Sequence, residues 1–153
     1  MNTIVVYASM TGTTELMART IADELTKAGD QVVVKDALET YAVELTSYER
    51  ILVGSYTWGD GELSDEMMGF YDELENIDLS GKRAAAFGSG CTTYEQFASA
   101  VDILEEALKQ QGCTIITTGL KADTWSDGEE KIKADCVDFV KKIITLSNEV
   151  SAT

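Results

Sequence analysis

Apolar runs of strand length recur along this chain and alternate with segments whose apolar residues follow a helical period. The runs cover Thr3 to Tyr7, Gln31 to Lys35, Ile51 to Ser55, Arg83 to Gly88 and Thr114 to Thr117. Largely apolar strands that alternate with one-sided helices indicate a parallel sheet covered on both faces and linked by right-handed crossovers. The pattern therefore predicts an α/β fold, a three-layer α/β/α sandwich around a five-stranded parallel sheet.

Three of the helical segments have clear apolar stripes, and two of them have clear ends. The first is expected to begin near Thr13 and to stop at Gly29, and the second stops at Gly112. Their stripes consist of Met17, Ile21 and Leu25, of Val101, Leu104 and Leu108, and of Ile132, Cys136, Phe139, Val140 and Ile143 in the last helix. We expect residues 1–147 to form a single domain and residues 148–153 to form a frayed C-terminal tail.

Composition narrows the classes of function. The formal charge of −15 argues against nucleic acid and anionic membranes as partners and favours a partner with a basic face. The chain has no histidine, which excludes Ser-His-Asp catalysis, a histidine general base and the usual zinc sites. Cys91, Cys113 and Cys136 have no CxxC spacing and no secretory leader precedes them, so we expect reduced thiols in a cytoplasmic monomer. No apolar run approaches the length of about 20 residues that spans a bilayer.

The segment from Ser9 to Thr14 joins the first strand to the first helix and is rich in hydroxyl groups. A helix N-terminus offers unpaired N–H donors and a partial positive charge, so this turn predicts a socket for an anion such as a phosphate monoester. Residues 1–18 contain no Lys or Arg, and their only charged side chain is Glu15. The donors would therefore be neutral, unlike those of a nucleotide-triphosphate loop, which needs its lysine. By itself, the segment also fits an ordinary capped turn.

Two further loops follow the third and fourth strands and each carries an aromatic residue. The first reads Tyr56-Thr57-Trp58-Gly59-Asp60-Gly61, and the second runs from Ser89 to Phe97 with Tyr94 after its Gly90 turn. In sheets of this class ligands lie outside the carboxyl ends of the strands, where the strand order reverses. Trp58 and Tyr94 beside a phosphate socket favour a planar heteroaromatic ring held by stacking. The alternative is that each aromatic merely covers an end of the sheet.

These three loops, in this order and on this strand pattern, resemble those of the flavodoxins, and the resemblance covers essentially the whole chain. The strand order 2-1-3-4-5 with FMN at the point of reversal is a known property of that family and is not deduced from spacing here. The chain lacks the long insertion of one subgroup after Thr114, so it resembles a short-chain flavodoxin.

The resemblance implies a role for particular residues. The FMN phosphate would be held by Ser9, Met10, Thr11, Gly12, Thr13 and Thr14. Trp58 would cover the inner face of the flavin and Tyr94 the outer face, while the Gly59–Asp60 peptide would meet flavin N5. Backbone groups of Ser89, Gly90 and Cys91 would contact the pyrimidine edge, and the cofactor loops would be completed by Tyr56, Thr57, Gly61 and Phe97. Cys91 stands where the family commonly has an acidic residue.

The implied function is that of a low-potential one-electron carrier, an electron-transfer protein and not an enzyme. Its FMN would shuttle between semiquinone and hydroquinone to serve reductases and oxidoreductases. Residues 51–81 contain no Lys or Arg but eight carboxylates: Asp60, Glu62, Asp65, Glu66, Asp72, Glu73, Glu75 and Asp78. At ~10 Å and an effective dielectric constant of ~40, each would cost an anionic flavin ~0.8 kcal/mol. Four such neighbours would lower the second potential by more than ~100 mV. The same acids would guide redox partners with basic surfaces.

Other functions of this fold class fit the residues less well. A phospho-accepting receiver domain needs paired acids after the first strand, where this chain has Ala8-Ser9-Met10. A phosphatase loop around Cys91 needs an arginine at the position of Phe97. An FMN-dependent reductase of a small acceptor such as a quinone remains an alternative, as does a redox-sensing flavoprotein module.

Overall fold

The computed structural model describes residues 1–9, 12–57, 63–91, 98–124 and 126–152, with side chains described as far as residue 146. Within these ranges, a parallel sheet has the order β2-β1-β3-β4-β5, and β6 also pairs with β4. The strands are β1 (Asn2–Ala8), β2 (Gln31–Asp36), β3 (Arg50–Tyr56), β4 (Arg83–Gly90), β5 (Thr114–Ile115) and β6 (Leu120–Asp123). The predicted sheet order and the predicted parallel pairing are confirmed.

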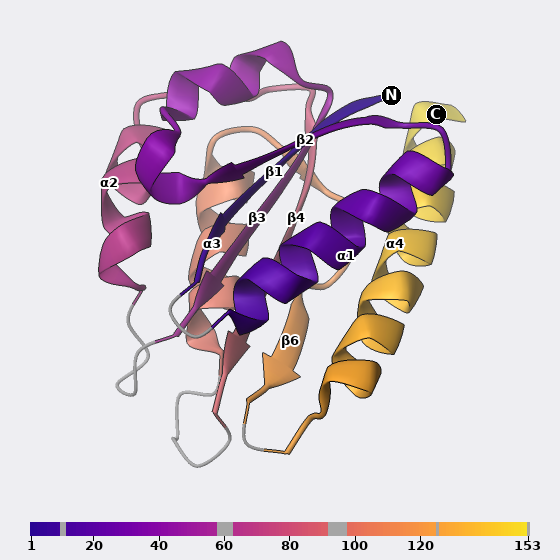
Figure 1. The fold of residues 1–153 in the computed structure, drawn as a ribbon. Coiled ribbons are helices and arrows are strands. Elements are labelled where there is room, and N and C mark those ends of the chain that lie inside the picture. The colour runs from indigo at the N-terminus through magenta and orange to yellow at the C-terminus, as the bar shows by residue number, and fades with distance from the viewer. Residues whose placement is uncertain (10–11, 58–62, 92–97, 125, 153) are drawn as a thin grey trace.

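Four α-helices cover the sheet, two on each face (Figure 1). They are α1 (Thr13–Lys27), α2 (Asp65–Leu74), α3 (Ser99–Gln110) and α4 (Glu129–Ala152). Successive side chains of β1 point to opposite faces of the sheet. Val5 packs in the cluster that α1 and α4 close, whereas Ile4 and Val6 pack in the cluster that α2 and α3 close. Side chains buried on both faces explain why the strands read as nearly continuous apolar runs.

The fifth strand position differs from the sequence prediction of one strand over residues 114–117. It is filled by two short strands, so the sheet has six strands in five positions. The interruption has a local cause at Gly119, whose N–H donates to Glu105 Oε1 of α3 at 3.0 Å. A Cβ on Gly119 would lie 2.4 Å from Val101 Cγ1, so the chain turns aside from the ladder to pack closely on α3.

Helix α4 and two 3₁₀ helices add to the predicted pattern. Helix α4 runs to Ala152, and its last residues contain neither Gly nor Pro to stop it. Between β2 and β3 the chain forms two 3₁₀ helices, η1 (Ala37–Glu39) and η2 (Ala42–Ser47). Asp36 starts η1, because its side chain accepts a hydrogen bond from the Leu38 N–H at 2.9 Å.

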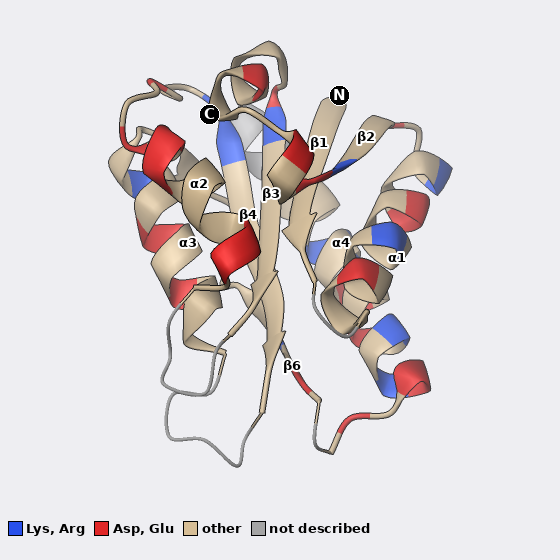
Figure 2. Cartoon of the chain, turned by 60° about the vertical axis from the view of Figure 1, so that its left-hand side comes forward, with Lys and Arg blue, Asp and Glu red and all other residues tan. Residues whose placement is uncertain are grey.

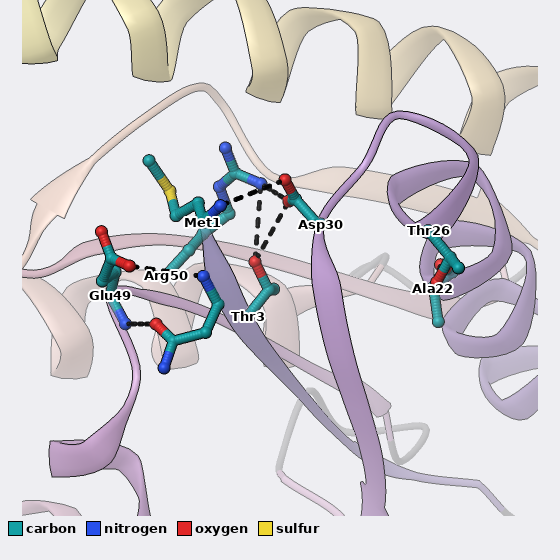
Figure 3. A network of polar contacts seen from close by, with 8 residues as sticks. Met1, Thr3, Ala22, Thr26, Asp30, Glu49 and Arg50 are labelled. Atoms are coloured by element: carbon teal, nitrogen blue, oxygen red, sulfur yellow. Dashed lines mark hydrogen bonds and ion pairs between the residues drawn. The ribbon is translucent and has the colours of Figure 1, made fainter.

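A buried ion pair lies at the amino-terminal edge of the sheet, where β1 and β3 begin (Figure 3). The Arg50 guanidinium is 3% exposed and pairs with Asp30, whose other oxygen lies 3.8 Å from the Met1 amine. Thr3 Oγ1 accepts a weak hydrogen bond from Arg50 at 3.5 Å. Burial lowers the pKa of Arg50 from its ordinary value, although Asp30 opposes that shift. Asp30 therefore supplies the counter-charge for a guanidinium that is buried and remains charged.

Candidate functional site

The carboxyl ends of β1, β3 and β4 meet at one edge of the sheet, the lower edge in Figure 1. Ala8 pairs with Ser55, and Tyr56 pairs with Ser89, so the three predicted loops leave the sheet side by side. The Thr57 N–H donates to the Ser89 carbonyl at 3.0 Å and extends this pairing one residue beyond β3. The strand order reverses between β1 and β3, which is where a ligand of such a sheet binds.

The turn from Ser9 into α1 has the form of an anion socket. Gly12 is the N-cap with φ 95°, a left-handed conformation that favours glycine, and its N–H donates to Ser9 Oγ at 3.1 Å. Among the described residues, no side chain caps the first turn of α1. Its backbone N–H groups and the positive end of its dipole therefore remain available beside the Thr13 and Thr14 side chains. Met10 and Thr11 lie outside the described residues.

A hydrogen bond fixes the start of α1 against the end of β4. Thr14 Oγ1 lies 2.9 Å from Ser89 Oγ, and both residues are buried. The single acid in this turn, Glu15, is occupied: Arg19 pairs with it at 2.9 Å and the Tyr7 hydroxyl donates to it at 3.3 Å. Neutral hydroxyls and helix N–H groups thus dominate the socket, and this donor set suits a phosphate monoester.

The loop after β3 is held at both ends by polar contacts. Ser55 Oγ lies 3.1 Å from Ser64 Oγ, and Thr57 forms an antiparallel bridge with Leu63. Tyr56 is buried, and its hydroxyl donates to Glu66 Oε2 of α2 at 2.6 Å. Burial and this hydrogen bond raise the pKa of Tyr56 well above its usual range. The Tyr56 hydroxyl therefore serves to attach the end of β3 to α2.

Thr57 joins the second loop to the third. Its Oγ1 accepts a hydrogen bond from the Ala100 N–H at 3.1 Å, in the first turn of α3. Ala98, the N-cap of α3, has no hydroxyl to offer that turn and adopts a left-handed φ of 49°. Thr57 therefore caps α3 from another loop. The predicted site residues Trp58, Gly59, Asp60 and Gly61 lie outside the described residues.

The end of β4 approaches α3 very closely. A Cβ on Gly90 would lie 2.5 Å from the Ala98 nitrogen, so only glycine fits there without displacement of the backbone. Cys91 follows and is half-buried, while Ser89 is buried. The predicted residues Tyr94 and Phe97 lie outside the described residues.

A fourth segment, which the sequence did not suggest, also reaches this edge. The Gly90 carbonyl accepts hydrogen bonds from the Thr124 N–H at 2.8 Å and from its hydroxyl at 3.0 Å. Asp123 is buried beside them and accepts a hydrogen bond from the Ser126 hydroxyl at 2.7 Å. The signal available in the sequence was weak, because β6 reads Leu-Lys-Ala-Asp and has no apolar run to mark it as a strand.

The acids of residues 51–81 are spread along α2 and beyond it: Asp65 and Glu66 begin the helix at the carboxyl edge of the sheet, whereas Glu75 and Asp78 follow its end toward the amino-terminal edge. Of the eight, Asp60 and Glu62 lie outside the described residues. Within the described chain, none of the other six forms an ion pair, although Glu66 and Glu73 accept hydrogen bonds from Tyr56 and from the Ala42 N–H. Two Ser80 hydrogen bonds lower the pKa of Asp78. The described residues contain no cluster of ligands for a metal ion and no helix able to span a membrane.

Comparison with known proteins agrees with the resemblance seen in the sequence and with the sheet order of the structure. The flavodoxin family model matches residues 5–136. A probable flavodoxin 2 of Bacillus subtilis is 42% identical over 129 residues, which cover 84% of this chain and 85% of that protein. The crystal structure of oxidised flavodoxin 2 from Bacillus cereus is 42% identical, with a TM-score of 0.88 over 95% of this chain and 99% of the other. Flavodoxin 1 of the same organism is 36% identical, with a TM-score of 0.89 over 95% and 98% of the two chains.

Proposed function

Because this chain belongs to the flavodoxin family, whose members are electron-transfer proteins and not enzymes, we propose that it carries single electrons at low potential on one non-covalently bound FMN. When bound, FMN supplies one-electron chemistry between its semiquinone and hydroquinone forms. The observation that carries the proposal is the first turn of α1, which is uncapped by side chains and lies at the reversal of strand order.

The described residues would hold the phosphate end of FMN. Ser9 and Gly12 shape the turn, and Thr13 and Thr14 begin the helix whose N–H groups face the socket. Met10 and Thr11 would complete it. Because no lysine or arginine occurs among residues 1–18, the phosphate would be held by neutral donors alone.

The flavin end would rest on the two loops anchored by Thr57 and Gly90. We assign the inner face to Trp58, the outer face to Tyr94, the N5 position to the Gly59–Asp60 peptide and the pyrimidine edge to Ser89, Gly90 and Cys91. The cap from Thr57 to Ala100 supports this assignment, since it ties both loops to α3. Tyr56, Gly61 and Phe97 remain in the proposed set as neighbours of these contacts.

The charges of the chain would set the potential. Asp65 and Glu66 begin α2 at the carboxyl edge of the sheet, and neither forms an ion pair within the described chain, so their negative field would reach the proposed flavin loops. A second electron added near them meets that field, which lowers the second potential. The same field would attract redox partners with basic surfaces and would slow their association as salt is added.

Compartment and domain organisation follow from less specific features. Cys113 and Cys136 are buried thiols outside any disulfide, which favours a reducing compartment, and we propose a cytoplasmic monomer. We further propose that residues 1–147 act as one FMN-binding domain. Sedimentation at micromolar concentration tests the oligomeric state directly.

Titration of the chain with FMN and, separately, with riboflavin tests the socket. If the start of α1 holds the phosphate, FMN should bind more tightly than riboflavin by about a hundredfold or more, as expected for loss of several charge-assisted hydrogen bonds. Equal affinities would refute the assignment, and failure to bind either flavin would refute the proposed function.

A redox titration followed by visible absorbance then tests the carrier role. Two separate one-electron steps are expected, the second well below the first. Cys91→Asp should lower the second potential by about a few tens of mV, because it adds one more negative charge beside the pyrimidine edge. A single two-electron step, or steady turnover of NAD(P)H with a quinone, would instead favour a reductase.

A further inference from the structure

A groove lies between η1 and the outer face of α2, away from the phosphate socket. Its volume is about 350 Å³, and it is lined by residues from both elements. Ala37 and Phe70 are buried in its floor, and apart from Gly69's chain neighbours and the backbone of α2 nothing comes within 4 Å of the position that a Cβ on Gly69 would take. We call this feature the η1–α2 groove. Its floor is apolar and has room for a side chain from outside.

The most exposed large apolar side chains of the described chain are Leu38 and Tyr41, which line the groove, and Val43, which lines the adjoining hollow. Leu38 is 69% exposed, Tyr41 68% and Val43 59%, whereas Val33 and Met68 are 37% and 40% exposed. Tyr41 and Val43 also line a second hollow of about 280 Å³, which continues past Glu73 to Ile77. Neighbouring apolar side chains left in water over two adjoining hollows are typical of a surface that another protein covers.

The groove walls are acidic. Glu39, Asp65, Glu66 and Glu73 line the groove, and its described lining includes no Lys or Arg. Two of these carboxylates are held in place, Glu66 by the Tyr56 hydroxyl at 2.6 Å and Glu73 by the Ala42 N–H at 2.7 Å. Among the described residues, two lysines contact η2: Lys35 is paired with Glu44, and Lys82 donates to the Thr46 carbonyl at 2.8 Å. In Figure 2 the ribbon of α2 shows acidic positions and no basic ones.

We propose that the η1–α2 groove docks a partner protein that presents an aliphatic or aromatic side chain flanked by Lys or Arg. The apolar floor would take the side chain, and the four carboxylates would meet the basic flanks. A second copy of this chain is a poor occupant, because its charge is −15 and a symmetric contact would bring like charges together. Nucleic acid and anionic membranes would be repelled by the same acids.

The position of the groove relates it to electron transfer, and to that extent the inference rests on the proposed function. Glu66 lines the groove and binds Tyr56, which lies two residues before the proposed flavin contact Trp58. Asp65 begins α2 at the carboxyl edge of the sheet. A partner seated in the groove would therefore lie beside the proposed flavin loops without covering the phosphate socket.

Peptide binding to the isotope-labelled, FMN-loaded full chain tests the groove by NMR. The probe is a capped Lys-Lys-Trp-Lys-Lys peptide, and its control replaces the tryptophan with glycine. We expect amide shifts at Leu38, Tyr41 and Gly69. Leu38→Ser, Tyr41→Ser and the control peptide should each weaken binding by about fivefold, because each removes apolar burial at the contact.

Charge variants distinguish binding in the groove from nonspecific attraction to the acidic surface. Asp65→Asn should weaken binding by about twofold, whereas Asp72→Asn, on the same helix but outside the groove lining, should have less effect. The proposal is overturned if the two variants weaken binding equally, if Leu38→Ser and Tyr41→Ser leave it unchanged, or if the shifts map elsewhere. FMN loading is read from visible absorbance of the same samples, so a failure of the proposed function is detected separately from a failure of the groove.

Discussion

The hydroxyl of Thr14 lies 2.9 Å from the hydroxyl of Ser89, although the two residues are 75 positions apart in the sequence. Thr14 belongs to the first turn of α1, and Ser89 lies near the end of β4. Their hydrogen bond therefore fixes the proposed phosphate socket relative to the strand that would contact the other end of FMN.

Removal of one partner of this pair should be more harmful than removal of both. Thr14→Val leaves the Ser89 hydroxyl buried without its partner, so we expect a loss of about 1–2 kcal/mol in the free energy of unfolding. The double variant Thr14→Val, Ser89→Ala should recover part of that loss. Urea denaturation at a fixed FMN concentration measures both. A double variant no more stable than Thr14→Val alone would contradict the assignment.

Alkaline pH should reveal the bond between Tyr56 and Glu66. Burial and this bond raise the pKa of Tyr56 above its ordinary value of 10.0, so the folded protein keeps a proton that the unfolded chain loses. The free energy of unfolding should therefore fall as pH rises above about 10. Tyr56→Phe should reduce that fall, and Glu66→Gln should give an intermediate slope. Identical slopes in denaturant titrations across this range would refute the prediction.

The ion pair of Asp30 with Arg50 should matter for stability and not for the cofactor. Asp30→Asn leaves a guanidinium that is 3% exposed without its counter-charge, and we expect a loss of about 3 kcal/mol. Adding Arg50→Met should restore much of it, because the buried charge is then gone. FMN affinity should stay within about twofold in both variants, since the pair lies at the opposite edge of the sheet.

Gly90 should not tolerate a side chain. Gly90→Ala places a methyl group about 2.5 Å from the Ala98 nitrogen, so β4 and the start of α3 must separate. We expect a loss of about 1–3 kcal/mol in stability and weaker FMN binding. Gly128→Ala is a matched control, because nothing lies within 4 Å of its Cβ position. Equal effects of the two substitutions would show that the close approach is unimportant.

The three thiols should react at very different rates. Burial raises the pKa of Cys113 to about 11 and that of Cys136 to about 12. At about pH 8 these thiols are almost entirely protonated and are also inaccessible, whereas Cys91 is half-buried. Alkylation followed by mass spectrometry should modify Cys91 first, and bound FMN should slow that reaction. Early modification of Cys136 would contradict the buried position found here.

The layers and most element boundaries could be predicted because they depend on local pattern, whereas the strand order came from the resemblance to the flavodoxins. The apolar run from Ile51 to Ser55 marks a strand buried on both faces, and Gly29 and Gly112 mark helix ends with φ values of 101° and 99°. Helices η1 and η2 were missed because they are too short to show a helical period. The one local signal was Asp36, whose side chain caps η1.

The contacts that shape the candidate site could not be predicted in the same way. Thr57 caps a helix that begins 42 positions later, since α3 starts at Ser99, and nothing near Thr57 in the sequence indicates this. Tyr56 illustrates the difference between a position and a role. The sequence put Tyr56 at the start of the second loop, whereas the structure makes it the last residue of β3, and only the fold shows that its hydroxyl binds Glu66.

Arg50 opens β3 and Tyr56 closes it, so one strand of seven residues connects the buried ion pair to the loop that follows. The two ends of β3 therefore affect different properties, stability at Arg50 and the proposed cofactor site at Tyr56. Substitutions at Arg50 are expected to change the free energy of unfolding. Substitutions in the loop after Tyr56 are expected to change the binding of FMN. The thermal stability of the protein could therefore be raised by changes around the ion pair while the proposed FMN site is left unaltered.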